Sequence, residues 1–95
     1  MTNFSDMLSK AKDMQEKMQK VQEQIKKIEV EGEAGGKLVK VILTGEYELK
    51  SITISDEAKK EDYEIINDLI IAAYNNAKEK LKKQSAEELS KITGG

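Results

Sequence analysis

The sequence predicts an α+β fold with a long helix, three antiparallel strands and a second helix, in the order α-β-β-β-α. Apolar residues recur with a helical period near both ends of the 95-residue chain, whereas in the middle they alternate with polar residues. Two turn signals, Gly35-Gly36 and Gly45-Glu46, divide the middle into strands. There is no repeat, linker or low-complexity stretch, so we expect residues 1–95 to form one domain.

The first segment predicts one helix over residues 4–28, which Asn3 or Ser5 can cap. Its apolar positions follow a heptad pattern with alternating spacings of 3 and 4, at Phe4, Met7, Ala11, Met14, Met18, Val21, Ile25 and Ile28. Acidic residues precede lysines by four positions, which favours ion pairs along the helix, at Asp6–Lys10, Asp13–Lys17, Glu16–Lys20 and Glu23–Lys27.

The heptad seam needs an apolar surface to pack on, and two surfaces compete for it. One is the sheet of the same chain, and the other is a second subunit. The positions that flank the seam hold no acidic residue, so a parallel self-paired coiled coil would lack the usual salt bridges between helices. We therefore expect the seam to pack on the chain's own sheet, at least in the C-terminal half of the helix.

The middle segment predicts a three-stranded meander. Residues 28–34 alternate as a strand with one wet face, Ala34-Gly35-Gly36 forms a hairpin turn, and residues 37–44 form the second strand. Residues 47–55 form the third strand. Its apolar residues change parity between Leu49 and Ile52, which predicts a bulge or a strand buried on both faces.

The second strand predicts two partly apolar faces. Val39, Val41 and Leu43 point one way, and Leu38, Lys40 and Ile42 point the other way. The second face is therefore half apolar, and we expect it to be partly covered, with Ile42 as a candidate subunit contact.

The C-terminal third predicts a second helix. Ser55-Asp56 offers a cap for a short helical turn that ends near Glu61. From about Asp62 onward a helical stripe follows, at Ile66, Leu69, Ile70, Ala73, Ala77 and Leu81. Beyond Leu81 the apolar residues become sparse, so we expect the end of this helix to fray.

The composition argues against an enzyme. The sequence has no cysteine and no histidine, which removes the usual zinc ligands and the commonest general base. The glycines of residues 32–36 are followed by a strand rather than by a helix, so a hairpin explains them better than a phosphate-binding loop does. The scattered acidic residues of the middle favour helix starts over a magnesium site. We expect no cofactor and no metal, and a cytoplasmic protein without a membrane segment.

The charges are unevenly distributed despite a net charge of −2. Residues 46–68 hold eight acidic residues and three lysines, whereas the remainder holds ten acidic residues and thirteen lysines. All sixteen cationic residues are lysines. Lysine suits phosphates, whereas arginine is better shaped to read guanine. The densest basic patch lies at Lys78, Lys80, Lys82 and Lys83. It can serve either as a solubilising helix face or as a nucleic-acid contact, and without interleaved aromatic residues it favours duplex DNA over single strands.

The run from Leu8 to Gln22, with Met14-Gln15-x-x-Met18, resembles the opening helix of the YbaB/EbfC family. Further matches follow in order, at Val30-Glu31-Gly32, Gly35, Leu38-Val39-Lys40-Val41, Gly45, Ile52-x-Ile54 and Ala72-Ala73-Tyr74-Asn75-Asn76-Ala77. The resemblance implies a tweezer-like dimer whose helices project from a central sheet and grip duplex DNA. It also implies a location in the bacterial nucleoid and a role near recombination or replication.

We therefore expect a non-enzymatic, nucleoid-associated homodimer that binds double-stranded DNA with little sequence specificity. Lysines of both helices are the expected DNA contacts, namely Lys10, Lys12, Lys17, Lys20, Lys78, Lys80, Lys82 and Lys83. The alternative is a dimeric protein-interaction adaptor for a replication or recombination partner.

Overall fold

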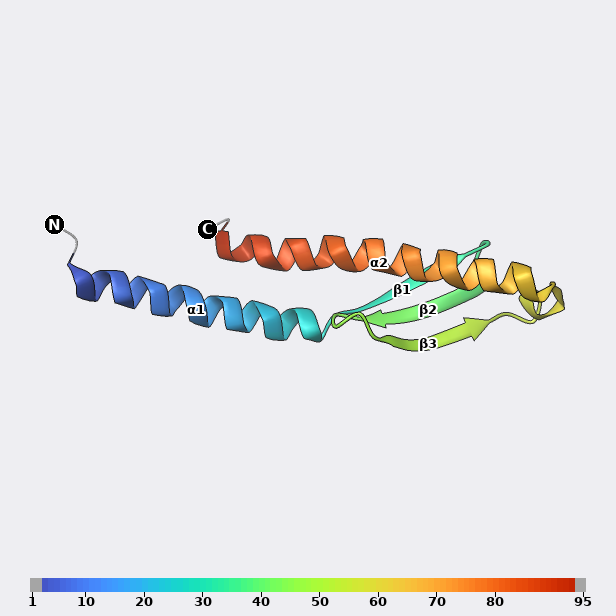
Figure 1. Ribbon diagram of the computed structural model, residues 1–95, viewed down its shortest axis with the longest axis horizontal. Coiled ribbons are helices and arrows are strands. Elements are labelled where there is room, and N and C mark those ends of the chain that lie inside the picture. The colour runs from blue at the N-terminus through green and yellow to red at the C-terminus, as the bar shows by residue number, and fades with distance from the viewer. Residues whose placement is uncertain (1–2, 94–95) are drawn as a thin grey trace.

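The computed structural model describes residues 3–93, which form an elongated molecule of 71 × 18 × 16 Å (Figure 1). The expected order α-β-β-β-α is confirmed. A short 3₁₀ helix, η1, precedes the second long helix. The elements are α1 (Phe4–Lys26), β1 (Glu29–Ala34), β2 (Val39–Thr44), β3 (Leu49–Ile54), η1 (Ala58–Lys60) and α2 (Tyr63–Thr93).

Helix α1 begins and ends at residues that explain its length. The side-chain oxygen of Asn3 accepts a hydrogen bond from the Asp6 N–H at 2.9 Å, so Asn3 is the N-cap. At the other end the turn between β2 and β3 meets the helix. A Cβ atom on Gly45 would lie 1.6 Å from the Ile25 carbonyl oxygen, so only glycine fits there. The helix stops at Lys26, two residues before the expected end, and Lys27 caps it by donating its N–H to the carbonyl oxygen of Gln24.

The sheet is antiparallel with the strand order β1-β2-β3. The first hairpin is confirmed, but its turn is longer than expected, because Gly35, Gly36 and Lys37 all have positive φ. Strand β2 therefore begins at Val39 rather than at Lys37. The same turn moves Leu38 to the α2 side, where it packs against the core, so Leu38 does not share a face with Ile42 as the sequence suggested.

The change of parity in β3 is a bulge. Ile42 pairs with Ser51, whereas the next residue, Leu43, pairs with Leu49, so Lys50 has no partner across the ladder. The extra residue places Leu49 and Ile52 on the same face of the sheet. That face also carries the buried side chains of β2.

The core lies between α2 and strands β1 and β2 (Figure 1). Its buried apolar residues are Val30, Val39, Val41, Leu43, Ala58, Ala73, Ala77 and Leu81. The helix approaches β1 closely because both sides are small at the contact. A Cβ atom on Gly32 would lie 2.2 Å from the Ala73 carbonyl oxygen, so the glycine sets the distance between helix and strand.

Helix α1 does not pack on the sheet, so that expectation is wrong. Helix α2 extends past the end of the sheet, and α1 lies beside this extension (Figure 1). On α1, Val21 and Ile25 are half-buried. Further along, residues of both helices line a groove of about 330 Å³, namely Met14, Met18, Ala86, Leu89, Ser90 and Ile92. The sparse apolar residues beyond Leu81 thus meet α1, and α2 is helical to Thr93.

Candidate nucleic-acid interface

The lysines of α1 are all exposed to solvent. The ion pairs among residues 3–93 are Lys40–Glu31, Lys50–Glu29, Lys59–Asp56 and Lys91–Glu88, and none of them involves an α1 lysine. The acid–lysine pairs expected four positions apart on this helix are therefore not formed. Exposed pairs of this kind gain little over separate hydration, because holding two long side chains together costs entropy. The α1 ammonium groups consequently face water and are accessible to an anionic partner.

The α1 lysines lie on two flanks of the helix. Lys10 and Lys17 are seven residues apart and Lys20 follows three residues later, which places the three on one flank of the heptad seam. Lys12 lies on the other flank. Asp6 and Asp13 lie on the same flank as Lys10 and Lys17, so a duplex lying along α1 would meet lysines alternating with carboxylates on that side.

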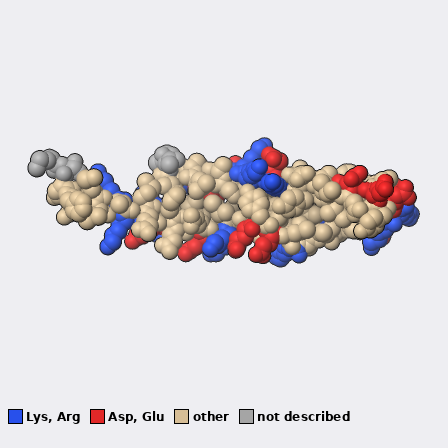
Figure 2. Space-filling view, viewed as in Figure 1, with Lys and Arg blue, Asp and Glu red and all other residues tan. Residues whose placement is uncertain are grey.

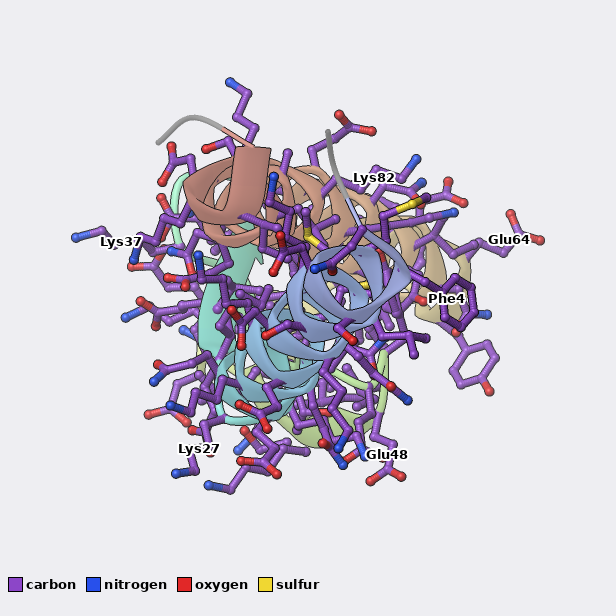
Figure 3. The ribbon with its side chains drawn as sticks, turned by 90° about the vertical axis from the view of Figure 1, so that its left-hand side faces the viewer. Phe4, Lys27, Lys37, Glu48, Glu64 and Lys82 are labelled. Carbon is purple, nitrogen blue, oxygen red and sulfur yellow. The ribbon has the colours of Figure 1, made fainter. Side chains whose placement is uncertain are left out.

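The basic patch expected on α2 is divided between two sides of the helix. Lys78 and Lys82 are four residues apart and share one side, from which Lys82 projects beyond the ribbon (Figure 3). Lys80 and Lys83 lie on the β1 side. There they line a groove of about 440 Å³ that also contains three carboxylates, those of Glu29, Glu31 and Glu87.

Lys80 and Asn76 hold the free edge of β1. The Lys80 ammonium donates a hydrogen bond to the Glu31 carbonyl oxygen at 2.8 Å. The Glu33 N–H donates to the Asn76 side-chain oxygen at 3.1 Å. Strand β1 has a neighbouring strand on one side only, so these contacts satisfy backbone groups that another chain would otherwise pair with. The available signal of this role is the position of Asn76 itself, since asparagine is unfavourable in the middle of a helix.

One group of acidic residues lies at the far end of the molecule, where α2 begins. Figure 2 shows carboxylates at the end where α2 begins, with lysines on the lower side of the same end and further carboxylates along the lower side of the molecule. Lys59 lies at this end, and its ammonium group is 3.7 Å from the Asp56 carboxylate. The acidic middle expected from the sequence is therefore divided, because residues 56–68 lie at this end together with Lys59 and Lys60, whereas Glu46 and Glu48 lie in the β2–β3 turn beside the end of α1.

Strand β3 exposes apolar side chains that the sequence did not single out as a contact surface. Leu49 is 43% exposed and Ile52 is 44% exposed, although both lie on the same sheet face as the core. Helix α2 packs on β1 and β2 and leaves β3 uncovered. The opposite face around Ile42 is polar instead, because Lys40 pairs with Glu31 and Lys50 with Glu29. The parity change across the bulge was the available signal for this surface.

Among residues 3–93 no helix is long and apolar enough to cross a membrane. The same described residues contain no cluster of three or more carboxylate, histidine or cysteine groups suited to a metal ion. The features that stand out are exposed lysines on two helices that lie side by side and run in opposite directions, and a strand with uncovered apolar side chains. They define a small α+β protein whose two long helices expose lysines and carboxylates to solvent.

Comparisons with known proteins identify the family. The model of the YbaB/EbfC DNA-binding family matches residues 1–95, and the chain belongs to this family. It is 46% identical over 96 residues to the nucleoid-associated protein Atu0095 of Agrobacterium fabrum, with all of this chain and 90% of that protein covered. It is 44% identical to the nucleoid-associated protein mlr5504 of Mesorhizobium japonicum, with the same coverage.

A solved structure shares the fold. The crystal structure of the uncharacterized protein HP0035 from Helicobacter pylori superimposes with a TM-score of 0.78 and covers 100% of both chains. The two sequences are 21% identical, so this likeness concerns the fold alone.

Proposed function

We propose that this protein binds double-stranded DNA as a homodimer, with little sequence preference, and that it acts in the nucleoid. The observation that carries the proposal is the set of exposed α1 lysines without carboxylate partners in the described part of the chain. Membership of a DNA-binding family and the names of the relatives support it. The absence of arginine from the sequence favours phosphate contacts over base reading.

The proposed contacts are the lysines expected from the sequence, namely Lys10, Lys12, Lys17, Lys20, Lys78, Lys80, Lys82 and Lys83. Their contributions differ. The α1 lysines and Lys82 are exposed and unengaged, whereas the ammonium group of Lys80 is already hydrogen bonded to the Glu31 carbonyl oxygen. Lys83 lies beside carboxylates in the groove along β1. The stronger contacts should therefore come from α1 and from Lys82.

The homodimer is proposed to form through β3 and the uncovered sheet face next to it. Exposed Leu49 and Ile52 provide the apolar contact, and within residues 3–93 the outer edge of β3 has no neighbouring strand. The edge of β1 is instead occupied by the side chains of Asn76 and Lys80. A 95-residue chain buries a modest core, so covering this surface would stabilise it. Two copies would also double the number of lysines that face a duplex.

The test is the affinity for a random-sequence duplex measured as a function of salt concentration. If three to four lysines per subunit neutralise phosphates, the slope of log affinity against log salt should be about −5 to −7 for a dimer. Affinities for unrelated duplexes should agree within a few-fold, because phosphate contacts carry no sequence information. Binding that is absent at low salt, or that depends sharply on sequence, would contradict the proposal.

A second candidate is a dimeric adaptor for a replication or recombination protein. The exposed apolar side chains on α2, such as Tyr63 and Ile71, favour it because they suit a protein partner better than a phosphate backbone. The same titration separates the two candidates, since an adaptor of this kind needs no affinity for DNA.

A further inference from the structure

The first turns of α1 form an apolar surface that nothing in residues 3–93 covers. Helix α2 ends at Thr93, and α1 extends past that end (Figure 1). Phe4 is 73% exposed, Met7 59% and Leu8 54%, and Phe4 projects away from the ribbon (Figure 3). We name residues 4–14 the α1 tip, because the groove shared with α2 begins at Met14.

The pattern of the tip indicates that its partner is a helix. Its apolar residues continue, without a break in spacing, the heptad seam that packs beside α2 further along. A seam with spacings of 3 and 4 places side chains as knobs for the holes of another helix. A flat surface or a DNA groove does not require that spacing. The helix that carries the same seam, and is always present at the same concentration, is α1 of another molecule.

We propose that the α1 tip pairs with the α1 tip of a second molecule, antiparallel and centred near Ser9. In this register Phe4 lies opposite Met14 of the other molecule, and Met7 lies opposite its Ala11. Large side chains thus meet smaller or flexible ones, and a methionine sulfur next to an aromatic ring is a favourable contact. The two copies of Leu8 meet near the two-fold axis and widen the apolar contact.

The charges of the tip favour the antiparallel register. In this register Asp6 of each molecule lies on the same flank as Lys10 of the other, about two residues away along the helix axis. The two copies of Lys10 are equally close to each other, so two attractive pairs stand against one repulsive pair. Both groups are exposed and have no ion-pair partner among the described residues. A parallel register would instead place Lys10 beside Gln15 and would offer no such pair.

The size of the contact sets its strength. Three turns of helix bury a few hundred Å² on each molecule, below the roughly 800 Å² per partner of a standard stable interface. We therefore expect weak association in dilute solution. It would strengthen when molecules are held close together, because tethering raises their effective concentration. If the proposed DNA binding is correct, tip pairing would link dimers bound to separate duplexes, but the pairing itself does not depend on DNA.

Because the chain has no cysteine, disulfide trapping in the absence of DNA tests the register directly. Equal amounts of Phe4→Cys and Met14→Cys proteins are mixed under mild oxidation, and the products are separated by mass. We expect the mixed disulfide to exceed either self-linked product about tenfold, because only that pair meets the geometric limits of a disulfide. Ser5→Cys mixed with Asp13→Cys is the matched control, since these positions share the axial level but point away from the seam.

A charge exchange provides an independent measurement. Lys10→Asp gives an acidic tip and Asp6→Lys gives a basic tip, so each protein alone should associate less than the unmodified protein at high concentration. An equal mixture should recover the association, as measured by sedimentation velocity.

In the disulfide experiment, self-linked Phe4→Cys products as abundant as the mixed product would overturn the antiparallel pairing.

Substitution of Met7 separates the tip contact from the other interfaces. We expect Met7→Asp to abolish the higher-order association and to leave the pair formed through β3 intact. If Met7→Asp separated that pair into monomers, the tip would belong to the homodimer interface and the proposal would be wrong. If Met7→Asp reduced only DNA affinity and left protein association unchanged, the tip would contact the duplex instead.

Discussion

The ammonium nitrogen of Lys80 lies 2.8 Å from the carbonyl oxygen of Glu31, so a lysine of α2 occupies the free edge of β1. Lys82 is only two residues further along, but two residues rotate an α-helix by about 200°, so Lys82 projects from another side of α2 (Figure 3). The basic patch that looks continuous in the sequence therefore contains both a structural contact, at Lys80, and an accessible charge, at Lys82.

This difference predicts unequal effects of two similar substitutions. Lys82→Gln should reduce the magnitude of the salt slope by about 0.9 per subunit, since one phosphate contact is lost. Lys80→Gln should change the slope less and should lower the free energy of unfolding by about 0.5–1 kcal/mol, because a hydrogen bond to the backbone is lost. Salt titrations and urea unfolding of the two variants provide the comparison. Equal slopes for both variants would show that Lys80 leaves Glu31 when DNA binds.

The α1 lysines should carry most of the proposed affinity for DNA. Lys17→Gln combined with Lys20→Gln should weaken binding to all duplexes alike, because phosphate contacts position the protein without specifying a sequence. The matched control is Lys59→Gln combined with Lys60→Gln, which removes the same charge at the end of the molecule where α2 begins. Neither pair should alter stability by more than about 0.5 kcal/mol, since all four side chains are exposed. If the control weakened binding equally, net charge rather than the α1 surface would explain the affinity.

Local patterns predicted the elements well. The heptad spacing identified α1, and the stripe through Ala73, Ala77 and Leu81 identified the buried side of α2. The change of parity in β3 located the bulge at Lys50. Each of these features depends on the period of a regular element, which a single segment records by itself.

Features that depend on distant contacts were not predictable in this way. The sequence could not show that α2 extends beyond the end of the sheet. The apolar seam of α1 therefore packs beside α2 and not, as the spacing alone had suggested, on the sheet. The positive φ of Lys37 moved Leu38 to the core side of the sheet, although simple alternation placed it with Ile42. Likewise, the Lys80 contact with β1 joins residues 49 positions apart. Which lysines of α2 are engaged was therefore decided by packing rather than by spacing.

Close approach of α2 to β1 predicts a specific intolerance at Gly32. In Gly32→Ala the new methyl group would lie 2.2 Å from the Ala73 carbonyl oxygen, so helix and strand must separate. We expect a loss of about 2–3 kcal/mol in the free energy of unfolding, as for other overpacked sites. Gly36→Ala is the control, because no atom lies within 4 Å of its added Cβ and only the positive φ opposes it, at about 1 kcal/mol. Thermal unfolding at one protein concentration measures the stability of both variants. Equal losses of stability would mean that α2 and β1 can move apart at Gly32 at little cost.

The uncovered face of β3 leads to the last prediction. Ile52 and Thr53 are adjacent and both exposed, but they point to opposite faces of the strand. Ile52 lies on the face that continues the core, whereas Thr53 lies on the polar face with Lys40. If the homodimer forms through β3, a carboxylate at position 52 would be buried in an apolar contact, and its desolvation would oppose association. The same charge at position 53 would stay in water.

We therefore expect Ile52→Asp to sediment as a monomer at micromolar concentration, and Thr53→Asp to remain a dimer. The DNA affinity of Ile52→Asp should fall together with dimerisation, and its salt slope should be about half that of the dimer, because one subunit presents half the lysines. Far-ultraviolet circular dichroism establishes whether each variant is folded, and Leu49→Asp provides a second substitution on the same face. A dimer that survives both Ile52→Asp and Leu49→Asp would place the subunit contact elsewhere, and Ile42→Asp then tests the opposite face of the sheet.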